Sequence, residues 1–333
     1  MTEETLRAWA LEAGFSAAAL CPAAGFDAAL QRVQEQAEIP ERRQLRFFPE
    51  QDWPWARSLA VLLWPYAPAA LPGPGEVFVD SYYRASNAAY HAARALQTRL
   101  SQAGVRAQAN VSYPAREAAV RAGLGVIGQN GLLISPQLGT RTVIILMTTE
   151  LPAPDRAAPA GPGECLRCGR CARACPAGAI DAQGMSHPER CLRNFMMEGT
   201  VVPQALRARM GARLLGCDVC QRVCPMQPAR EPESLCVPLA GLLTDDEARF
   251  SQAVRALSDV VGKNVARPQR VRAQAALLAA NCGCAQAAGV LRAWAQSPFE
   301  AVHVHAAWAL EQLEGRKIHA PGEAGVDPES KSD

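Results

Sequence analysis

Residues 165–176 read CLRCGRCARACP, which places four cysteines in the pattern C-x2-C-x2-C-x3-C-P. This is the bacterial ferredoxin run, in which the first three thiolates bind one 4Fe–4S cluster and the fourth binds a second cluster. Thiolates suit iron because they are soft, anionic ligands. The run therefore predicts a ferredoxin-like double-cluster domain and requires a second set of cysteines.

A second set follows about forty residues later. Residues 217–225 read CDVCQRVCP, the same kind of run with one cysteine missing from its front, and the upstream Cys191 can supply it. The two runs and Cys191 then supply eight ligands, four for each cluster. We assign the first cluster to Cys165, Cys168, Cys171 and Cys224. We assign the second cluster to Cys175, Cys191, Cys217 and Cys220.

Two other readings of these cysteines remain open. Zinc also binds sets of four thiolates, but this spacing, with its following prolines, is not that of a zinc ribbon. Eight buried structural cysteines would satisfy the composition alone. The remaining cysteines, Cys21, Cys236, Cys282 and Cys284, are expected to be small buried residues at the ends of helices.

Composition places the chain among globular proteins. Of 333 residues, 49% are apolar and 20% are charged, and the length predicts two or three domains. No apolar run approaches the ~18 residues of a membrane helix, and the acidic start does not resemble a signal peptide. We therefore expect a cytoplasmic protein without a membrane partner, in which clustered cysteines favour metal over disulfides. The net charge of +2 is too small to indicate a strongly acidic or strongly basic binding partner.

Residues 1–155 are predicted to form an N-terminal α/β domain, because helical and strand patterns alternate along them. Predicted helices cover residues 2–13, 26–38, 86–100 (with Ser86 as the cap) and 115–122; predicted strands cover 17–21, 57–66, 105–111 and 140–149.

After a Pro/Gly-rich linker at 152–163, the cluster domain is expected over 156–237. A helical domain is expected over 238–316, in which a capping box at 244–247 predicts the start of a helix, and a disordered tail is expected at 317–333. Residues 271–280 resemble 302–313, as in stacked helix-pair repeats. The overall class is α+β.

Gly123, Gly125 and Gly128 match G-x-G-x-x-G. A dinucleotide fingerprint follows a strand and opens a helix, whereas here a helical pattern precedes the glycines and none follows. The glycines still indicate either close approach of the backbone to a flat ligand or a tight structural turn.

These motifs together resemble the epoxyqueuosine reductase family, cobalamin-dependent double iron–sulfur enzymes of tRNA modification. The resemblance covers about residues 1–315, and GCDVCQRVCP is its most specific phrase. The C-terminal helices fit the HEAT-like units with which some members end. The segments that carry the resemblance are 57–68, 89–91, 122–130, 165–176 and 216–225.

The resemblance implies a reductive mechanism. Cobalamin would bind beside the glycine loop, which makes Gly125, Gly128 and Asn130 candidate cofactor residues. Electrons would pass from the solvent-side cluster to the inner cluster and then to cobalt. The Co(I) nucleophile would open an epoxide, a general acid would protonate the oxygen, and the product would be queuosine at the tRNA wobble position. The implied partners are tRNA and an electron-donor protein.

The sequence departs from the family where the catalytic aspartate is expected. The family has Asp-x-Ala-Pro about thirteen residues before the A-G-L-G turn, whereas residues 109–117 contain no aspartate. Asn110 and Tyr113 are the nearest candidates, and Ala89 replaces the aspartate that usually precedes Tyr-His. These changes indicate a divergent paralogue. The alternatives are a related corrinoid and iron–sulfur reductase of another substrate, or a non-enzymatic electron-transfer protein.

Two arginine-rich stretches are the candidates for binding tRNA phosphates. Residues 190–230 carry seven arginines, and residues 263–292 carry five basic residues and no acid. Arg270 and Arg272 are the predicted phosphate-binding pair. The alternative is arginine solvated on helical faces.

Overall fold

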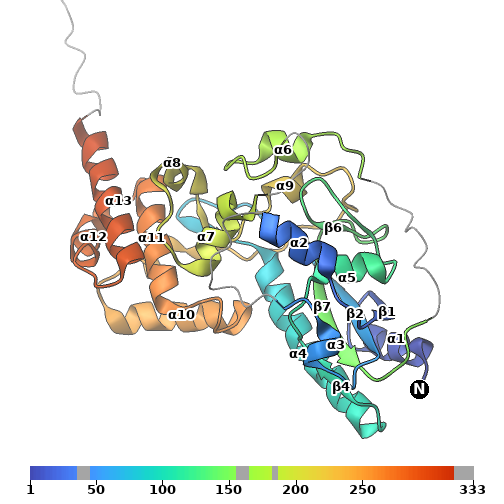
Figure 1. Cartoon of the computed structure of the whole chain (residues 1–333). Helices are drawn as coiled ribbons and strands as arrows, with labels where there is room; N and C mark the ends of the chain where they lie inside the picture. The colour runs from blue at the N-terminus through green and yellow to red at the C-terminus, as the bar shows by residue number, and fades with distance from the viewer. Residues whose placement is uncertain (36–45, 155–164, 182–186, 319–333) are drawn as a thin grey trace, which may run out of the picture.

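The computed structural model describes residues 1–35, 46–154, 165–181 and 187–318 (Figure 1). Most of the predicted linker and nearly all of the predicted disordered tail lie outside the described residues. Within these ranges, no helix combines the length and the apolar character needed to cross a bilayer.

A four-stranded antiparallel sheet with the order β1-β2-β7-β4 forms the centre of the N-terminal region. Its central strand β2 is buried from residue 58 to 63, which explains the continuous apolar pattern there. The strands are β1 (Ala17–Pro22), β2 (Ser58–Pro65), β7 (Thr142–Thr149) and β4 (Ala107–Ala109).

Helices cover both faces of this sheet, as the alternating pattern predicted. Alternate β2 side chains separate into two cores: Leu62 packs toward α1 and α4, and Val61 packs toward α2 and α5. The helices are α1 (Glu3–Glu12), α2 (Asp27–Glu35), α3 (Pro49–Asp52), α4 (Ser81–Gln102) and α5 (Ala115–Arg121).

Two predicted helix caps were wrong. Helix α4 begins at Ser81, not after Ser86, because the Asp80 carboxylate accepts a hydrogen bond of 3.0 Å from the Tyr82 amide. Helix α10 is capped by Asp246, and Thr244 instead accepts a bond from the Asp246 amide. The sequence offers several possible capping residues near each helix start, and the tertiary structure determines which one caps the helix. At α4, for example, the Asp80 amide is bonded to the distant Leu215 carbonyl.

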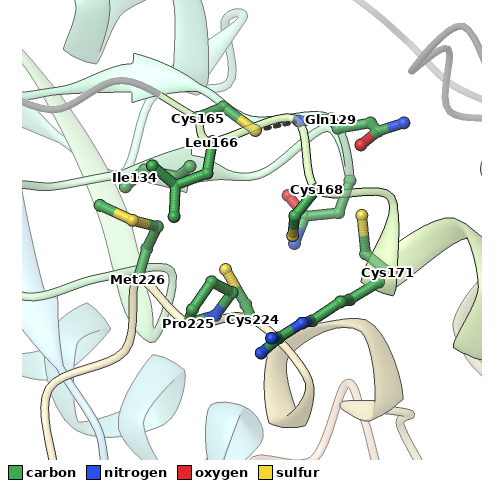
Figure 2. Close-up of a pocket in the computed structure, with 11 residues that line it drawn as sticks. Gln129, Ile134, Cys165, Leu166, Cys168, Cys171, Cys224, Pro225 and Met226 are labelled. Carbon is green, nitrogen blue, oxygen red and sulfur yellow. Dashed lines mark hydrogen bonds between the residues drawn. The ribbon is translucent and has the colours of Figure 1, made fainter.

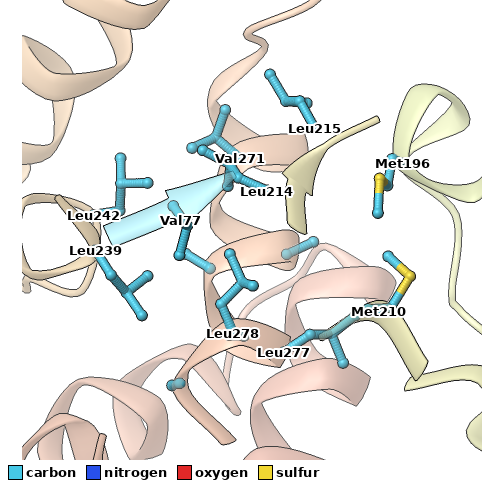
Figure 3. Close-up of a cluster of buried hydrophobic side chains, with 14 of the residues drawn as sticks. Val77, Met196, Met210, Leu214, Leu215, Leu239, Leu242, Val271, Leu277 and Leu278 are labelled. Atoms are coloured by element: carbon cyan, nitrogen blue, oxygen red, sulfur yellow. The ribbon is translucent and has the colours of Figure 1, made fainter. Parts of the chain in front are cut away.

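A second, three-stranded sheet was missed because its strands are only two to four residues long. Strand β3 (Glu76–Val79) pairs in parallel with β8 (Arg213–Leu215) and antiparallel with β9 (Val237–Pro238). Strand β3 therefore lies in one core with the C-terminal helices and with the cysteine-rich part of the chain (residues 165–181 and 187–237), which we call the cluster segment. Figure 3 shows Val77 beside Leu214, Leu239 and Val271 in that core.

The cluster segment consists of short elements, and longer helices follow it. Helix α11 packs against α13, so the two similar sequences become neighbours in space. The elements are α6 (Arg170–Ala174), α7 (Leu192–Glu198), α8 (Gln204–Arg207), α9 (Val219–Arg222), α10 (Glu247–Val261), α11 (Pro268–Asn281), α12 (Ala288–Trp294) and α13 (Glu300–Ile318).

The cysteines outside the two sets partly match expectation. Cys21 is buried in the sheet, and Cys236 and Cys284 are half-buried. Cys282 is exposed, so the expectation of a buried residue was wrong there. It occupies the C-cap of α11, where the helix ends at the surface.

Candidate iron–sulfur site

Four cysteines from two distant segments line one pocket (Figure 2). Cys165, Cys168 and Cys171 come from the loop before α6 and its first turn. Cys224 comes from the end of the segment that contains α9. The structure thus brings together the predicted first set, including the cysteine that crosses from the second run.

The other four predicted ligands lie at the ends of α6, α7 and α9. Cys175 ends α6, Cys191 precedes α7, and Cys217 and Cys220 flank the start of α9. Burial raises the pKa of the Cys217 thiol to about 11, and Cys191 adds to the effect. Burial also raises the pKa of Cys220, followed by the effects of Cys217, Cys191 and Cys175. The four thiols are therefore electrostatic neighbours.

These donor sets suit a multi-iron group. Burial raises the thiol pKa of Cys171, Cys217, Cys220 and Cys224, and neighbouring thiols add to the rise, so these four become thiolates readily only when a cation compensates their charge. No three cysteine, histidine or carboxylate side chains in the described part of the chain converge closely enough to hold a single metal ion. A cubane cluster carries one thiolate on each of its four irons, so its ligands surround a space instead of meeting at a point.

Backbone amides point at two of the sulfurs. The Gln129 amide donates to Cys165 Sγ at 3.4 Å, and the Ala179 amide donates to Cys175 Sγ at 3.2 Å (Figure 2 shows the first). Hydrogen bonds of this kind stabilise a thiolate and tune the reduction potential of an attached cluster.

A buried polar network joins the second cysteine set to the sheet. The Asp218 carboxylate accepts from Arg141 at 3.2 Å and from Arg222 at 2.8 Å. The Gln221 amide donates to the Tyr66 hydroxyl at 2.9 Å and to the Thr140 carbonyl at 2.8 Å. Sequence reasoning missed these residues, although the polar residues within CDVCQ were the available signal.

The same network affects the cap of α4. Burial raises the pKa of Asp80 to about 6, and the nearby Asp218 carboxylate adds to the rise. The first turn of α4 and the segment between Cys217 and Cys220 therefore share one buried electrostatic environment.

The glycine loop forms a hairpin of β5 (Val126–Ile127) and β6 (Leu133–Ile134). A side chain at Gly125 would collide with the Ile134 carbonyl oxygen, and one at Gly128 would lie 2.8 Å from the Ile134 side chain. Asn130 accepts a hydrogen bond from the Leu132 amide and lines the pocket of the first set. The hairpin's own packing thus accounts for both glycines, and they do not form an open cradle.

The two candidate acids lie apart. Asn110 has a left-handed backbone (φ 59°), and its amide donates to the Tyr90 carbonyl of α4 at 3.3 Å. Tyr113 packs on the opposite face of the sheet, in the core with α5, and donates to Asp52 at 2.7 Å. Burial and the Asp52 bond raise the Tyr113 pKa well above its usual value, which makes it a weaker acid.

The position next to Tyr90 is closed to a carboxylate. Ala89 is fully buried where α4 meets the sheet, so an aspartate in its place would carry an uncompensated buried charge. Tyr90 and His91 are exposed and stand edge to face at 5.3 Å. The fold thus brings Tyr90 and Asn110 together, but the described residues of this corner supply no carboxylate at either position where the family has one.

The predicted phosphate-binding pair was wrong. Arg270 is 9% exposed and donates to the backbone carbonyls of Asn264 and Val265. Arg272 pairs with Glu247 at 2.6 Å and lies over the Phe250 ring. Both guanidinium groups already have partners within the helical region, so neither presents a free charge to a phosphate.

Comparison with known proteins agrees with this geometry. Residues 164–227 match the family described as "4Fe-4S double cluster binding domain". The epoxyqueuosine reductase of Staphylococcus aureus is 34% identical over 147 residues, 41% of this chain and 38% of that protein. The enzyme of Synechococcus sp. is 40% identical over 119 residues, 35% of this chain and 36% of that protein. Each match thus spans little more than a third of the curated relative.

The fold agrees over a longer range. The crystal structure of an epoxyqueuosine reductase with an epoxyqueuosine-modified tRNA-Tyr stem loop covers 96% of this chain and 94% of its own, with a TM-score of 0.76 and 21% identity. The Bacillus subtilis enzyme covers 93% of this chain and 90% of its own, with a TM-score of 0.73 and 23% identity. At these identities the similarity establishes a shared fold.

Proposed function

We propose that this chain, which shares its fold and its cysteine motifs with the epoxyqueuosine reductase family, is an iron–sulfur oxidoreductase that reduces epoxyqueuosine to queuosine at the wobble position of tRNA. The observation that carries the proposal is the crossing of Cys224 into the pocket of Cys165, Cys168 and Cys171. This exchange between two runs is the arrangement of a double-cluster ferredoxin.

The proposal gives the two cysteine sets different roles. The first set includes Cys168, the one exposed cysteine among the eight proposed ligands, whereas all four cysteines of the second set are half-buried. Asp218, between those two cysteines, is bonded to Arg141 at the edge of the sheet domain. Electrons would therefore enter singly at the first cluster and pass to the second, which faces the sheet domain.

Cobalamin enters the proposal through the family resemblance of the sequence motifs. When bound, it would supply a strongly nucleophilic reduced cobalt. Gly125, Gly128 and Asn130 remain proposed cofactor residues, although the hairpin's packing against Ile134 already explains the glycines.

A second candidate is a reductase of the same architecture that acts on another substrate. The Bacillus subtilis relative has a catalytic loop carrying an aspartate. In this chain the corresponding region has the Asn110 carboxamide bonded to the Tyr90 carbonyl, and an amide does not donate a proton as a carboxylic acid does. Because no acid at this position would protonate the departing oxygen, the difference favours a substrate whose leaving group does not need a proton.

Binding of tRNA belongs to the same proposal. In it, the helices α10–α13 are HEAT-like repeats that contribute to the docking surface. Arg270 and Arg272 are excluded from it by their internal bonds. Arg190 and Arg292 have looser ion pairs, with Glu189 at 3.8 Å and Glu314 at 3.6 Å, and their side chains are 60% and 63% exposed, so they are the better phosphate-binding candidates.

The deciding experiment is anaerobic purification followed by absorption and EPR spectroscopy, with and without added cobalamin. We expect about eight iron atoms per chain, EPR signals after reduction, and a change in the corrinoid spectrum on mixing. Turnover is then measured by mass spectrometry on an epoxyqueuosine stem loop. A protein that contains zinc or no metal contradicts the iron–sulfur proposal, and clusters without turnover favour the second candidate.

A further inference from the structure

The first cysteine set reaches the surface at Cys168. Cys168 is exposed and the neighbouring Leu166 is 63% exposed, whereas Cys171 is buried. Exposed apolar side chains of this size are few in this protein, and this one adjoins a pocket lined by four thiols. The surface around Leu166 and Cys168 thus lies directly beside the proposed first cluster.

This surface is basic. Arg167, Arg170 and Arg173 are exposed, and residues 165–178 contain no acid. No carboxylate among the described residues forms an ion pair with any of the three; Arg173 instead donates to the Cys168 carbonyl at 3.2 Å. We call Leu166, Arg167, Cys168, Arg170 and Arg173 the entry face.

The backbone holds Arg167 in an unusual conformation. Its φ is 46°, in the left-handed region that glycine normally occupies, and it stands between Cys165 and Cys168. A glycine would fit this turn with less strain. The chain instead carries a charged side chain at the surface beside the thiols.

We propose that the entry face is the docking site of an acidic one-electron carrier protein, of the flavin or iron–sulfur class. An exposed apolar residue flanked by three arginines that form no ion pair with any carboxylate of the described ranges fits a protein interface with an apolar centre and a polar rim. An RNA phosphate would need the arginines but not the leucine, nor the adjoining thiols. The inference rests on the proposed function, because it needs a cluster at Cys165, Cys168, Cys171 and Cys224.

Electron transfer at this surface neither forms nor breaks a covalent bond. The reduced carrier loses one electron and the first cluster gains one, so that two encounters supply the two electrons of a reduction. No proton or leaving group moves at this surface. Charge complementarity would accelerate the encounter, and the acceleration would decline as salt screens the charges.

The test measures anaerobic stopped-flow reduction of the clusters by a purified, reduced flavodoxin of strongly negative net charge. We compare Arg167→Gln and Arg167→Glu with Arg255→Glu, a matched control on an exposed residue of α10. At low salt we expect the second-order rate constant to fall about threefold for the neutral variant and about tenfold for the reversed charge. The control is expected to match the unmodified protein.

Two further measurements separate the possible failures. Iron content and reduction by dithionite are expected to be equal in all these proteins, which shows that the clusters themselves are intact. Absence of a reducible cluster in the unmodified protein would overturn the proposed function itself. Intact clusters with unchanged carrier rates in both Arg167 variants would overturn only the docking site.

The unmodified protein provides a check that does not depend on a variant. Its reduction rate by the acidic carrier is expected to fall with ionic strength, whereas reduction by a charge-reversed carrier is expected to rise. The same salt dependence for both carriers contradicts the proposal. Loss of stem-loop binding in Arg167→Glu, with carrier rates retained, would identify the face as an RNA surface and also contradict it.

Discussion

Arg141 donates a hydrogen bond of 3.2 Å to Asp218, and the two side chains are only 5% and 2% exposed. Arg141 lies just before strand β7 of the central sheet, and Asp218 lies between two proposed ligands of the second cluster. Asp218 also accepts from Arg222, so two guanidinium groups compensate one buried carboxylate. The ion pair therefore links the orientation of the cluster segment to the sheet.

Asp218→Asn is expected to destabilise the protein by about 3–5 kcal/mol, because it leaves the Arg141 charge buried without its partner. The measurement is anaerobic denaturant unfolding, with Asp259→Asn on the exposed face of α10 as the control. Arg141→Met and the double variant complete a cycle. A double variant as unstable as the sum of the two single variants would show that the pair is not coupled.

Cys168→Ala and Cys220→Ala are each expected to remove about four of eight irons, because each cysteine belongs to a different proposed cluster. Cys236→Ala, which alters a half-buried cysteine outside both sets, is expected to retain them all. Iron is quantified after anaerobic purification, and EPR identifies the cluster that remains. Equal iron in all three variants would refute the ligand assignment.

Gly125→Ala is expected to destabilise the protein by several kcal/mol, because the added methyl group meets the Ile134 carbonyl oxygen and lies 3.1 Å from Ser135 Cα. Gly289→Ala on α12 is the matched control. A methyl group there meets no atom within 4 Å, and alanine favours helix. Thermal unfolding compares the two; a smaller loss for Gly125→Ala than for the control would show that the hairpin tolerates a side chain.

His305 makes the stability of the protein dependent on pH. It is fully buried, accepts a hydrogen bond from the Val202 amide at 2.9 Å, and has its other ring nitrogen 3.0 Å from the Ala273 carbonyl. Burial lowers its pKa from 6.5 to about 4. At pH values between 4 and 6.5 the unfolded state binds a proton at His305 that the folded state does not bind. The contribution of neutral His305 to the free energy of unfolding is therefore complete above about pH 6.5 and is lost as the pH falls toward 4.

The shift corresponds to a contribution of about 3 kcal/mol. Unfolding free energies at pH 7 and pH 5 measure about 2 kcal/mol of it, because the rest is lost between pH 5 and pH 4. His305→Gln is expected to be less stable at pH 7 but to lose less stability between the two pH values than the unmodified protein. An unchanged pH slope in the variant would assign the slope to other groups.

Asn110→Asp is expected to raise turnover of an epoxyqueuosine stem loop if the position can serve as the acid. The Tyr90 carbonyl, which now accepts from the Asn110 amide, would face a carboxyl group and favour its protonated form. Asparagine and aspartate both tolerate the left-handed backbone at this position. Asn110→Ala is the control without an acid, and equal turnover of both variants with cofactor bound would contradict the role.

The elements that the sequence predicted well are those encoded by local patterns. Strand β2 is an apolar run, helix α5 has a helical spacing, and both lie where the sequence placed them. The assignment of eight cysteines to two clusters depends only on residue spacing. The structure places Cys165, Cys168, Cys171 and Cys224 around one pocket, and the ligand assignment itself stays a prediction. Short strands such as β3 carry too few residues for a periodic signal.

Sequence alone determined the type of chemistry, because soft ligands at ferredoxin spacing suit iron whatever surrounds them. Tertiary structure decided which charges are available. From the sequence, Arg270, Arg272 and Arg167 are equally plausible as free cations. The fold buries or pairs the first two, whereas Arg167 is exposed and forms no ion pair with a carboxylate in the part of the chain that the structure describes. Burial and pairing arise from contacts between segments distant in the chain, and a linear pattern of charges contains no information about those contacts.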